Sequence, residues 1–219
     1  GTVNINTGAN LELYNSSGME GDLSVYNIAE SQYVELDSSN RSFSNSAALT
    51  GLGEYRLASG TLTPVDSSTD LTGIERPENT ATLRMTGGTL NIDTDVTLST
   101  SINISGGTLT GTGELTTSGA VTLSGNGSVT LQDTVWNNAG TLTLQDDVRL
   151  YLDSTTPTDG STDVVPTINN LFGATIEMGS NNFIPFYGVT ESGSASPIFN
   201  NSGTLNWNNQ NFSNGRSQI

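Results

Sequence analysis

The chain has 219 residues, and its 22 acidic residues against six basic ones give a formal net charge of -16. It contains no Cys, His or Lys, which excludes disulfides, Ser-His-Asp and Cys-His catalysis, and Schiff-base chemistry. The negative charge argues against nucleic acid and anionic membrane surfaces as partners, and no apolar run is long enough to insert directly into a membrane.

Residues 1–36 predict a series of very short β-strands. Their apolar residues occur in pairs with one polar residue between the two members: Val3/Ile5, Leu11/Leu13, Leu23/Val25 and Val34/Leu36. This alternation places both apolar side chains of a pair on one face of a strand. The Gly and Asn residues between the pairs suit turns that need a positive φ. The polar residues 37–48 are expected to form one longer turn.

The same alternation dominates residues 87–152. The pairs here are Leu90/Ile92, Val96/Leu98, Ile102/Ile104, Val121/Leu123, Val129/Leu131, Leu142/Leu144 and Val148/Leu150. The gaps between pairs are too short for the helix that joins neighbouring parallel strands in α/β folds. We therefore expect an all-β chain with one domain over residues 1–219. The expected fold is a single parallel β-solenoid (right-handed β-helix), in which each strand stacks on its counterpart one coil later.

Two sequence repeats predict coils of variable length. The first, Leu-x-Gly-x-Gly, begins at Leu49, Leu109 and Leu123. The second is Asn-Asn followed by Gly and an apolar pair, and its glycines are Gly140, Gly173 and Gly203. The unequal spacings within each repeat predict coils of roughly 20 to 33 residues.

The asparagines of the second repeat recur at one phase of the predicted coil. They are Asn137, Asn138, Asn169, Asn170, Asn200 and Asn201. Stacked Asn side chains can donate to one another from coil to coil, and they can also bond backbone groups at a turn. The repeat therefore predicts an amide ladder at one corner of the solenoid. The Asn-x-Ser/Thr triplets of this Asn-rich chain are not taken as evidence of glycosylation.

Three pairs of prolines predict loop excursions near residues 64–77, 157–166 and 185–197, because proline cannot donate to a β-ladder. Aromatic side chains around the last excursion are candidate ligand-binding residues, since they offer stacking surfaces to a sugar or peptide. They are Phe183, Phe186, Tyr187 and Trp207. The alternative is that these rings plug the core or cap the rod.

One acidic loop is a candidate calcium site. Asp153, Asp159 and Asp163 surround a turn at Gly160, and carboxylate oxygens are ligands that Ca²⁺ prefers. Neither the EF-hand pattern nor the glycine-rich calcium-binding nonapeptide is present. We expect no cofactor, with a structural Ca²⁺ in this loop as the alternative.

Catalysis would have to rely on paired carboxylates, for which Asp93 with Asp95 and Asp146 with Asp147 are the candidates. Acidic residues at such spacings more commonly lie on solvated faces, so we expect no enzymatic activity. The alternative is a β-helical polysaccharide hydrolase or lyase on the same fold.

Threonine is frequent at the outward positions of the predicted strands, as at Thr108/Thr110 and Thr141/Thr143. A flat threonine array suits an ice-binding solenoid, although exposed strand faces favour β-branched residues in any case. Ice binding is therefore a further alternative, together with a purely structural spacer.

Three segments carry a family resemblance: LTGTGELTTSGAVTLSGNGSVTL at 109–131, WNNAGTLTL at 136–144 and FNNSGTLNW at 199–207. They resemble the coils of large bacterial surface adhesins of the filamentous-haemagglutinin and autotransporter-passenger type, and the resemblance covers most of residues 49–207. It implies secretion to the bacterial cell surface and a role in adhesion, biofilm formation or virulence. The implied partner is a cell-surface glycan or protein receptor. Since the chain starts and ends in the same Gly/Asn-rich texture, we expect it to be part of a larger protein.

Overall fold

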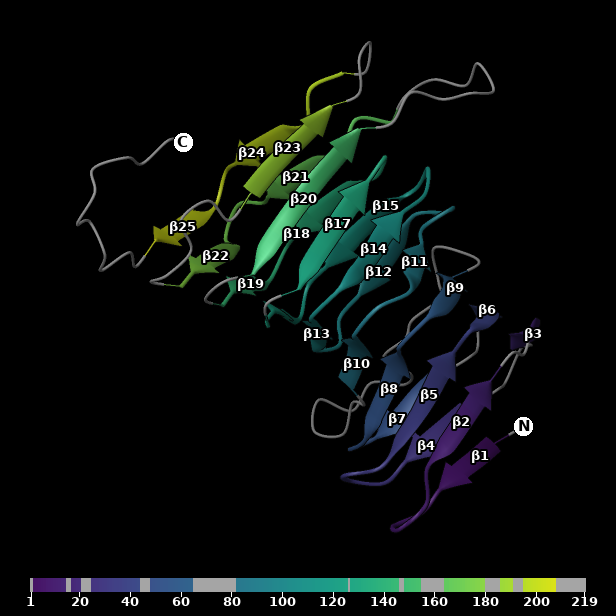
Figure 1. Ribbon diagram of the computed structural model, residues 1–219. Coiled ribbons are helices and arrows are strands. Elements are labelled where there is room, and N and C mark those ends of the chain that lie inside the picture. The colour runs from purple at the N-terminus through teal and green to yellow at the C-terminus, as the bar shows by residue number, and fades with distance from the viewer. Residues whose placement is uncertain are drawn as a thin grey trace.

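The computed structural model describes residues 2–14, 17–20, 25–43, 48–64, 82–125, 127–145, 148–154, 164–179, 186–190 and 195–207. Within these segments the chain forms 25 β-strands and no helix. The strand pairings between successive coils are parallel, and the strands lie side by side from the purple N-terminal end to the yellow C-terminal end (Figure 1). The predicted fold class, an all-β parallel solenoid of short strands, is confirmed.

The strands form four sheets, here called A to D. Sheet A contains β1 (Thr2–Ile5), β4 (Val25–Ile28) and β7 (Ala48–Gly51). Sheet B contains β2 (Leu11–Tyr14), β5 (Tyr33–Asp37), β8 (Glu54–Leu57), β10 (Thr82–Met85), β13 (Ile102–Ile104), β16 (Ala120–Leu123), β19 (Thr141–Leu144), β22 (Thr175–Met178) and β25 (Thr204–Trp207). Sheet C contains β3 (Ser17–Glu20), β6 (Ser39–Phe43), β9 (Gly60–Pro64), β11 (Thr89–Asn91), β14 (Gly107–Thr110), β17 (Ser128–Gln132), β20 (Arg149–Ser154) and β23 (Phe186–Thr190). Sheet D contains β12 (Val96–Leu98), β15 (Glu114–Thr117), β18 (Val135–Asn138), β21 (Thr167–Asn170) and β24 (Ile198–Asn201).

The chain visits these sheets in a repeating order. The first nine strands run A, B, C three times, and from β10 onward the order is B, C, D. Register shows directly that the coils differ in length: Leu83 pairs with Ile102 across a short coil, whereas Leu142 pairs with Ile176 across a much longer one. These two coils lie close to the lower and upper limits predicted from the sequence repeats.

The core consists of inward columns of apolar side chains, one residue from each successive coil. One column of sheet B contains Val34, Tyr55, Leu83, Ile102, Val121, Leu142 and Ile176, all of them buried. Two residues further along each strand, a second buried column contains Leu36, Leu57, Met85, Ile104, Leu123, Leu144 and Met178. Burial of these columns is the main source of stability because a single short strand has too little apolar surface to fold alone.

Two amide ladders occupy sheet D, where the sequence predicts stacked asparagines. In the inner ladder, Asn138 Nδ2 donates to Asn170 Oδ1 (2.8 Å), and Asn170 Nδ2 donates to Asn201 Oδ1 (2.7 Å). Asn138 and Asn170 are buried, and their Nδ2 atoms also donate to backbone carbonyls of the next coil, Thr175 (3.1 Å) and Thr204 (3.0 Å). The predicted amide ladder at a corner is confirmed.

The outer ladder runs in the opposite direction. Asn200 Nδ2 donates to Asn169 Oδ1 (2.9 Å), and Asn169 Nδ2 donates to Asn137 Oδ1 (2.7 Å). Asn137 Nδ2 in turn donates to Glu114 Oε2 (2.9 Å), so this ladder ends on a carboxylate. A charged acceptor strengthens the last bond of the chain.

Two sequence predictions about loops need correction. The polar segment 37–48 is not one turn, because Ser39–Phe43 forms β6 and pairs with both β3 and β9. Part of the predicted excursion 185–197 is also a strand, since Phe186–Thr190 forms β23 and pairs with β20. In both cases neighbouring coils supply the ladder bonds that the local composition does not suggest. Residues 65–77 and 157–163 of the other two excursions lie outside the described residues.

Candidate functional site

The outward face of sheet C is polar but uncharged over five successive strands. Its side chains alternate with the inward residues of β6, β9, β11, β14 and β17. Two from each strand form two files along the rod: Asn40, Thr61, Thr89, Thr108 and Thr130 in the first, and Ser42, Thr63, Asn91, Thr110 and Gln132 in the second. We call this set the hydroxyl–amide face. Its members can donate and accept hydrogen bonds, and none is ionisable.

Register aligns the threonines of this face in a single file. Thr61 pairs with Thr89, Thr89 with Thr108, and Thr108 with Thr130. All four side chains are half-buried between their neighbours. β-branched side chains have few χ1 rotamers, so the hydroxyls of this file are held in a regular array along the rod.

An aromatic pair continues the same file toward the C-terminal end. Thr130 pairs with Tyr151, and Tyr151 pairs with Tyr187. The two tyrosine rings are stacked, with their centroids 5.2 Å apart and their planes inclined by 22°. The guanidinium of Arg149 lies 5.8 Å from the Tyr187 ring centroid, in the range of a cation–π contact.

The change from Thr130 to Tyr151 makes a step in the surface. Tyr187 stacks on one ring face of Tyr151, so the other ring face is directed toward the coil that carries Thr130. The threonine side chain is much shorter than a tyrosine side chain. The result is a floor of hydroxyl and amide groups that ends at an aromatic wall. Sugars present hydroxyls at their edges and C–H groups on their ring faces, which suits such a floor and wall.

Asp153 lies on the same outward face as Tyr151, two residues further along β20. Its register partner on the preceding coil is Gln132 of the hydroxyl–amide face. The structure therefore brings two residues predicted from sequence, Tyr187 and Asp153, onto one face, although they were predicted for different ligands. Asp159 and Asp163, the other predicted calcium ligands, lie outside the described residues. The part of the chain that is described holds no cluster of three or more metal-ligating side chains.

The other predicted aromatic residues have different positions. Phe186 is the register partner of the inward residue Leu150, and its ring lies 5.1 Å from the ring of Phe199. Trp207 is the register partner of the inward residue Met178. Phe186 and Trp207 both pack against the core and are partly buried. Their positions match the alternative in which such rings plug the core or cap the rod. Of the three candidates that the structure describes, Tyr187 is the one on the outward face. Phe183 lies outside the described residues.

Sequence reasoning missed Tyr151 and Arg149. Tyr151 is the polar-side residue between Leu150 and Leu152, both of them buried, so the alternation itself assigns it to the outward face. What the sequence does not contain is the register that stacks Tyr151 on Tyr187 of the following coil.

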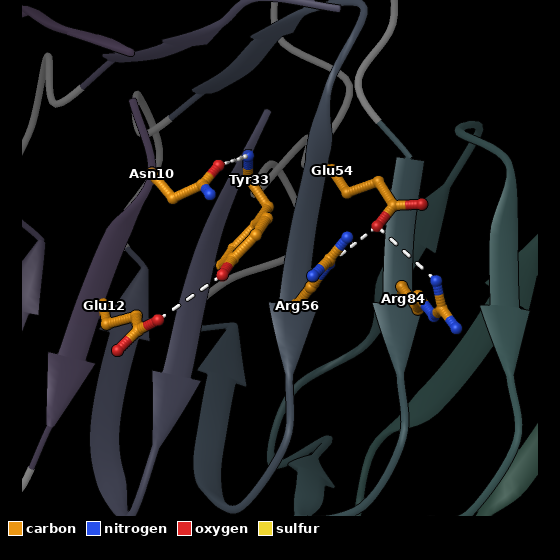
Figure 2. A network of polar contacts seen from close by, with 6 residues as sticks. All are labelled: Asn10, Glu12, Tyr33, Glu54, Arg56 and Arg84. Carbon is orange, nitrogen blue, oxygen red and sulfur yellow. Dashed lines mark hydrogen bonds and ion pairs between the residues drawn. The ribbon is translucent and has the colours of Figure 1, made fainter. Parts of the chain in front are cut away.

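A separate polar network lies on the outward face of sheet B, near the N-terminal end (Figure 2). The backbone N–H of Tyr33 donates to Asn10 Oδ1 (3.1 Å), and the Tyr33 hydroxyl donates to Glu12 (3.4 Å). The guanidinium of Arg56 lies 3.8 Å from the Tyr33 ring centroid and donates to Glu54 (2.7 Å). These contacts connect β2 and its preceding turn with β5 and β8.

The next coil extends this network. Arg84 is the register partner of Arg56, and Glu54 lies within 3.7 Å of the Arg84 guanidinium. Stacking two arginines in register is unfavourable unless a carboxylate lies between them. Glu54 supplies that carboxylate, so we interpret the network as a stabilising link between coils.

The carboxylate pair considered for catalysis has local hydrogen-bonding roles. Asp93 accepts from Asn91 Nδ2 (2.7 Å), and Asp95 accepts from the backbone N–H of Glu114 (3.0 Å). Both residues are exposed at the corner between β11 and β12. Asp146 and Asp147 lie outside the described residues.

Comparison with known proteins identifies no relative of this chain. No family model matches the sequence, and searches of curated proteins and of solved structures found no match. Among the described residues, no helix has the length and apolar character needed to cross a membrane. Function is therefore inferred from the geometry of the outward faces.

Proposed function

We propose that this chain is an attachment module of a secreted or surface-displayed bacterial adhesin, which binds glycans through the outward face of sheet C. The observation that carries the proposal is the stacked pair Tyr151–Tyr187 at the end of the hydroxyl–amide face. Aromatic rings beside convergent hydroxyl and amide groups are the chemistry that recognises sugars. The resemblance of its repeats to the coils of bacterial surface adhesins supports the same conclusion.

The architecture suits attachment rather than enclosure of a small ligand. Each coil adds one strand to every sheet that it visits, so an outward face grows in length with the number of coils. A long face can contact an extended or repeated receptor at several points. Several weak contacts of this kind give strong overall attachment.

Glycan-array binding of the wild type and of Tyr151→Ala tests the proposal. Removal of a stacking ring is expected to weaken binding by about 1 kcal/mol, which is a roughly five-fold rise in Kd. The Tyr14→Ala variant is the matched control because Tyr14 is a 65% exposed tyrosine on sheet B, away from the aromatic pair. It should bind as the wild type does.

Each array is run with Ca²⁺ and with a chelator, which also tests the calcium site predicted around Asp153. Glycan binding by the wild type that Tyr151→Ala leaves unchanged would contradict the assigned face. Absence of binding to any glycan under both conditions would contradict the proposed function and favour a structural spacer.

A further inference from the structure

We infer that the ligand is an uncharged, extended polysaccharide that lies along the rod on the hydroxyl–amide face, with one end against the Tyr151 ring. This inference rests on the proposed function, which requires only that some glycan binds sheet C. It adds the charge of the glycan, its minimum size and its direction relative to the strands.

The charge of the ligand follows from where charged residues lie. The chain has a net charge of -16, yet the ten side chains of the hydroxyl–amide face contain no ionisable group. The outward face of sheet B differs, with Glu12, Glu35, Arg56, Arg84 and Glu177 at equivalent central positions of its strands. The hydroxyl–amide face is therefore a neutral surface on a strongly acidic molecule, and Arg149 and Asp153 lie beyond its end on β20. An acidic polysaccharide would be repelled by the whole chain and would meet no cation on the floor of this face.

The direction of the ligand follows from the register. The threonine file runs perpendicular to the strands, from Thr61 to Thr130, and Tyr151 stands at its end. Neighbouring strands are about 4.8 Å apart, so the five strands β6 to β17 span roughly 19 Å along the rod. A polymer aligned with the rod contacts a hydroxyl or amide of every coil. A monosaccharide contacts only one or two coils.

The side chains of the hydroxyl–amide face are preorganised for binding. Nine of its ten side chains are half-buried, Asn40 alone being exposed, and most are β-branched or short. Little side-chain entropy is lost when such residues bind, so many weak hydrogen bonds can still sum to useful affinity. The repeating floor then recognises length, and the single Tyr151 ring recognises one sugar of the chain.

Ice is the other ligand that a regular threonine array suits. An ice surface is a plane, however, and the two tyrosine rings rise from the C-terminal end of the same file. A polysaccharide chain is narrow and can end at this wall with an apolar ring face against Tyr151. We therefore assign the face to a polysaccharide, and ice binding becomes one outcome of the test.

Affinity electrophoresis provides the test, with gels containing neutral polysaccharides (β-glucan, xylan, mannan, dextran and soluble chitin derivatives) or acidic ones (polygalacturonate, alginate). We expect at least one neutral polysaccharide, and neither acidic one, to retard the wild type. Neutral oligomers from disaccharide to hexasaccharide should then compete more strongly as their length increases.

Paired charge substitutions locate the binding face. Thr108→Glu places a carboxylate in the centre of the floor, whereas Thr122→Glu places one on the outward face of sheet B at a half-buried position of the following coil. We expect Thr108→Glu to abolish retardation and Thr122→Glu to leave it unchanged. Thr110→Glu, on the second file of the floor, is the replacement if Thr108→Glu does not fold, as judged by circular dichroism.

The outcomes that overturn the inference differ from those that overturn the proposed function. Retardation only by acidic polysaccharides would overturn the inference that the ligand is neutral. Equal competition by monosaccharides and hexasaccharides would overturn the inference that it is a polymer. Both results would leave the proposed function, glycan binding by an adhesin, intact. Thermal hysteresis in the wild type that Thr108→Glu removes, without retardation by any polysaccharide, would assign the face to ice. Glycan binding that both Thr108→Glu and Thr110→Glu retain would also overturn the inference.

Discussion

At the scale of single residues, the fold depends on which side of a short strand each side chain occupies. Leu142 is fully buried, with Val121 and Ile176 as its register partners on the two neighbouring coils. Thr143, the next residue, is half-buried on the outward face of the same strand. The two positions are adjacent in sequence but differ completely in their surroundings, so charge substitutions should distinguish them.

Leu142→Asp is expected to abolish cooperative folding because it places an unpaired carboxylate in a dry apolar column. Thr143→Asp should change the free energy of unfolding by only about 0.5 kcal/mol, as is usual for surface substitutions. Urea unfolding followed by circular dichroism measures both effects. An unchanged midpoint for Leu142→Asp would contradict the register of sheet B.

At the scale of elements, the two sequence repeats have different structural meanings. The Asn-Asn-Gly repeat always occupies the corner from sheet D to sheet B, and therefore marks a fixed phase of the coil. The Leu-x-Gly-x-Gly repeat occupies three different corners: β7 to β8, β14 to β15, and β16 to β17. This repeat allows a sharp corner wherever the chain needs one. At Gly111, for example, φ is +123° and a Cβ would meet the backbone of Ile92 on the preceding coil.

This difference explains how much of the fold the sequence predicts. Alternating apolar pairs predict the strands and their inward side chains, and the Asn repeat predicts coil length and the amide ladders. The sheet to which each strand belongs is not predictable, because one corner motif serves three corners. β6 is missed because Ser39 and Arg41 stand where other strands carry apolar residues.

The candidate site is predicted less completely than the fold. Tyr187 is identified from its aromatic character, but the stacking with Tyr151 depends on a register across a coil of variable length. The inward positions of Phe186 and Trp207 are not predictable for the same reason, because they depend on the register between coils. Their aromatic side chains alone suggest ligand stacking.

The inner amide ladder gives a prediction at this scale. Asn170 accepts from Asn138 and donates to Asn201 and to the backbone carbonyl of Thr204. Asn170→Leu removes these three hydrogen bonds at a buried position, and we expect a loss of about 2–3 kcal/mol in the free energy of unfolding, at roughly 1 kcal/mol for each bond. Asn200→Leu, at the exposed end of the outer ladder, should have an effect of about 0.5 kcal/mol or less.

Urea denaturation of the two asparagine variants measures the difference. Equal stability of Asn170→Leu and the wild type would show that the ladder satisfies no essential group. A large loss in Asn200→Leu would instead assign the stabilising role to the outer ladder.

At the scale of the whole molecule, stacking of coils produces both the core and the binding face. The register that aligns apolar residues inward also aligns the residues between them outward, so a repeated Thr becomes a file of hydroxyls without further adjustment. The faces then differ only in composition. Sheet B carries the ion-pair network of Figure 2, sheet D carries the outer amide ladder, and sheet C carries the neutral floor and the aromatic wall.

The most direct measurement is an NMR titration of the ¹⁵N-labelled chain with the shortest neutral oligosaccharide that competes in the electrophoresis experiment. If the glycan lies along sheet C, amide shifts should concentrate in β11, β14, β17 and β20, with little change in β16 and β19 of sheet B. Shifts that centre on sheet B or sheet D, with none near Tyr151, would contradict the proposed binding face.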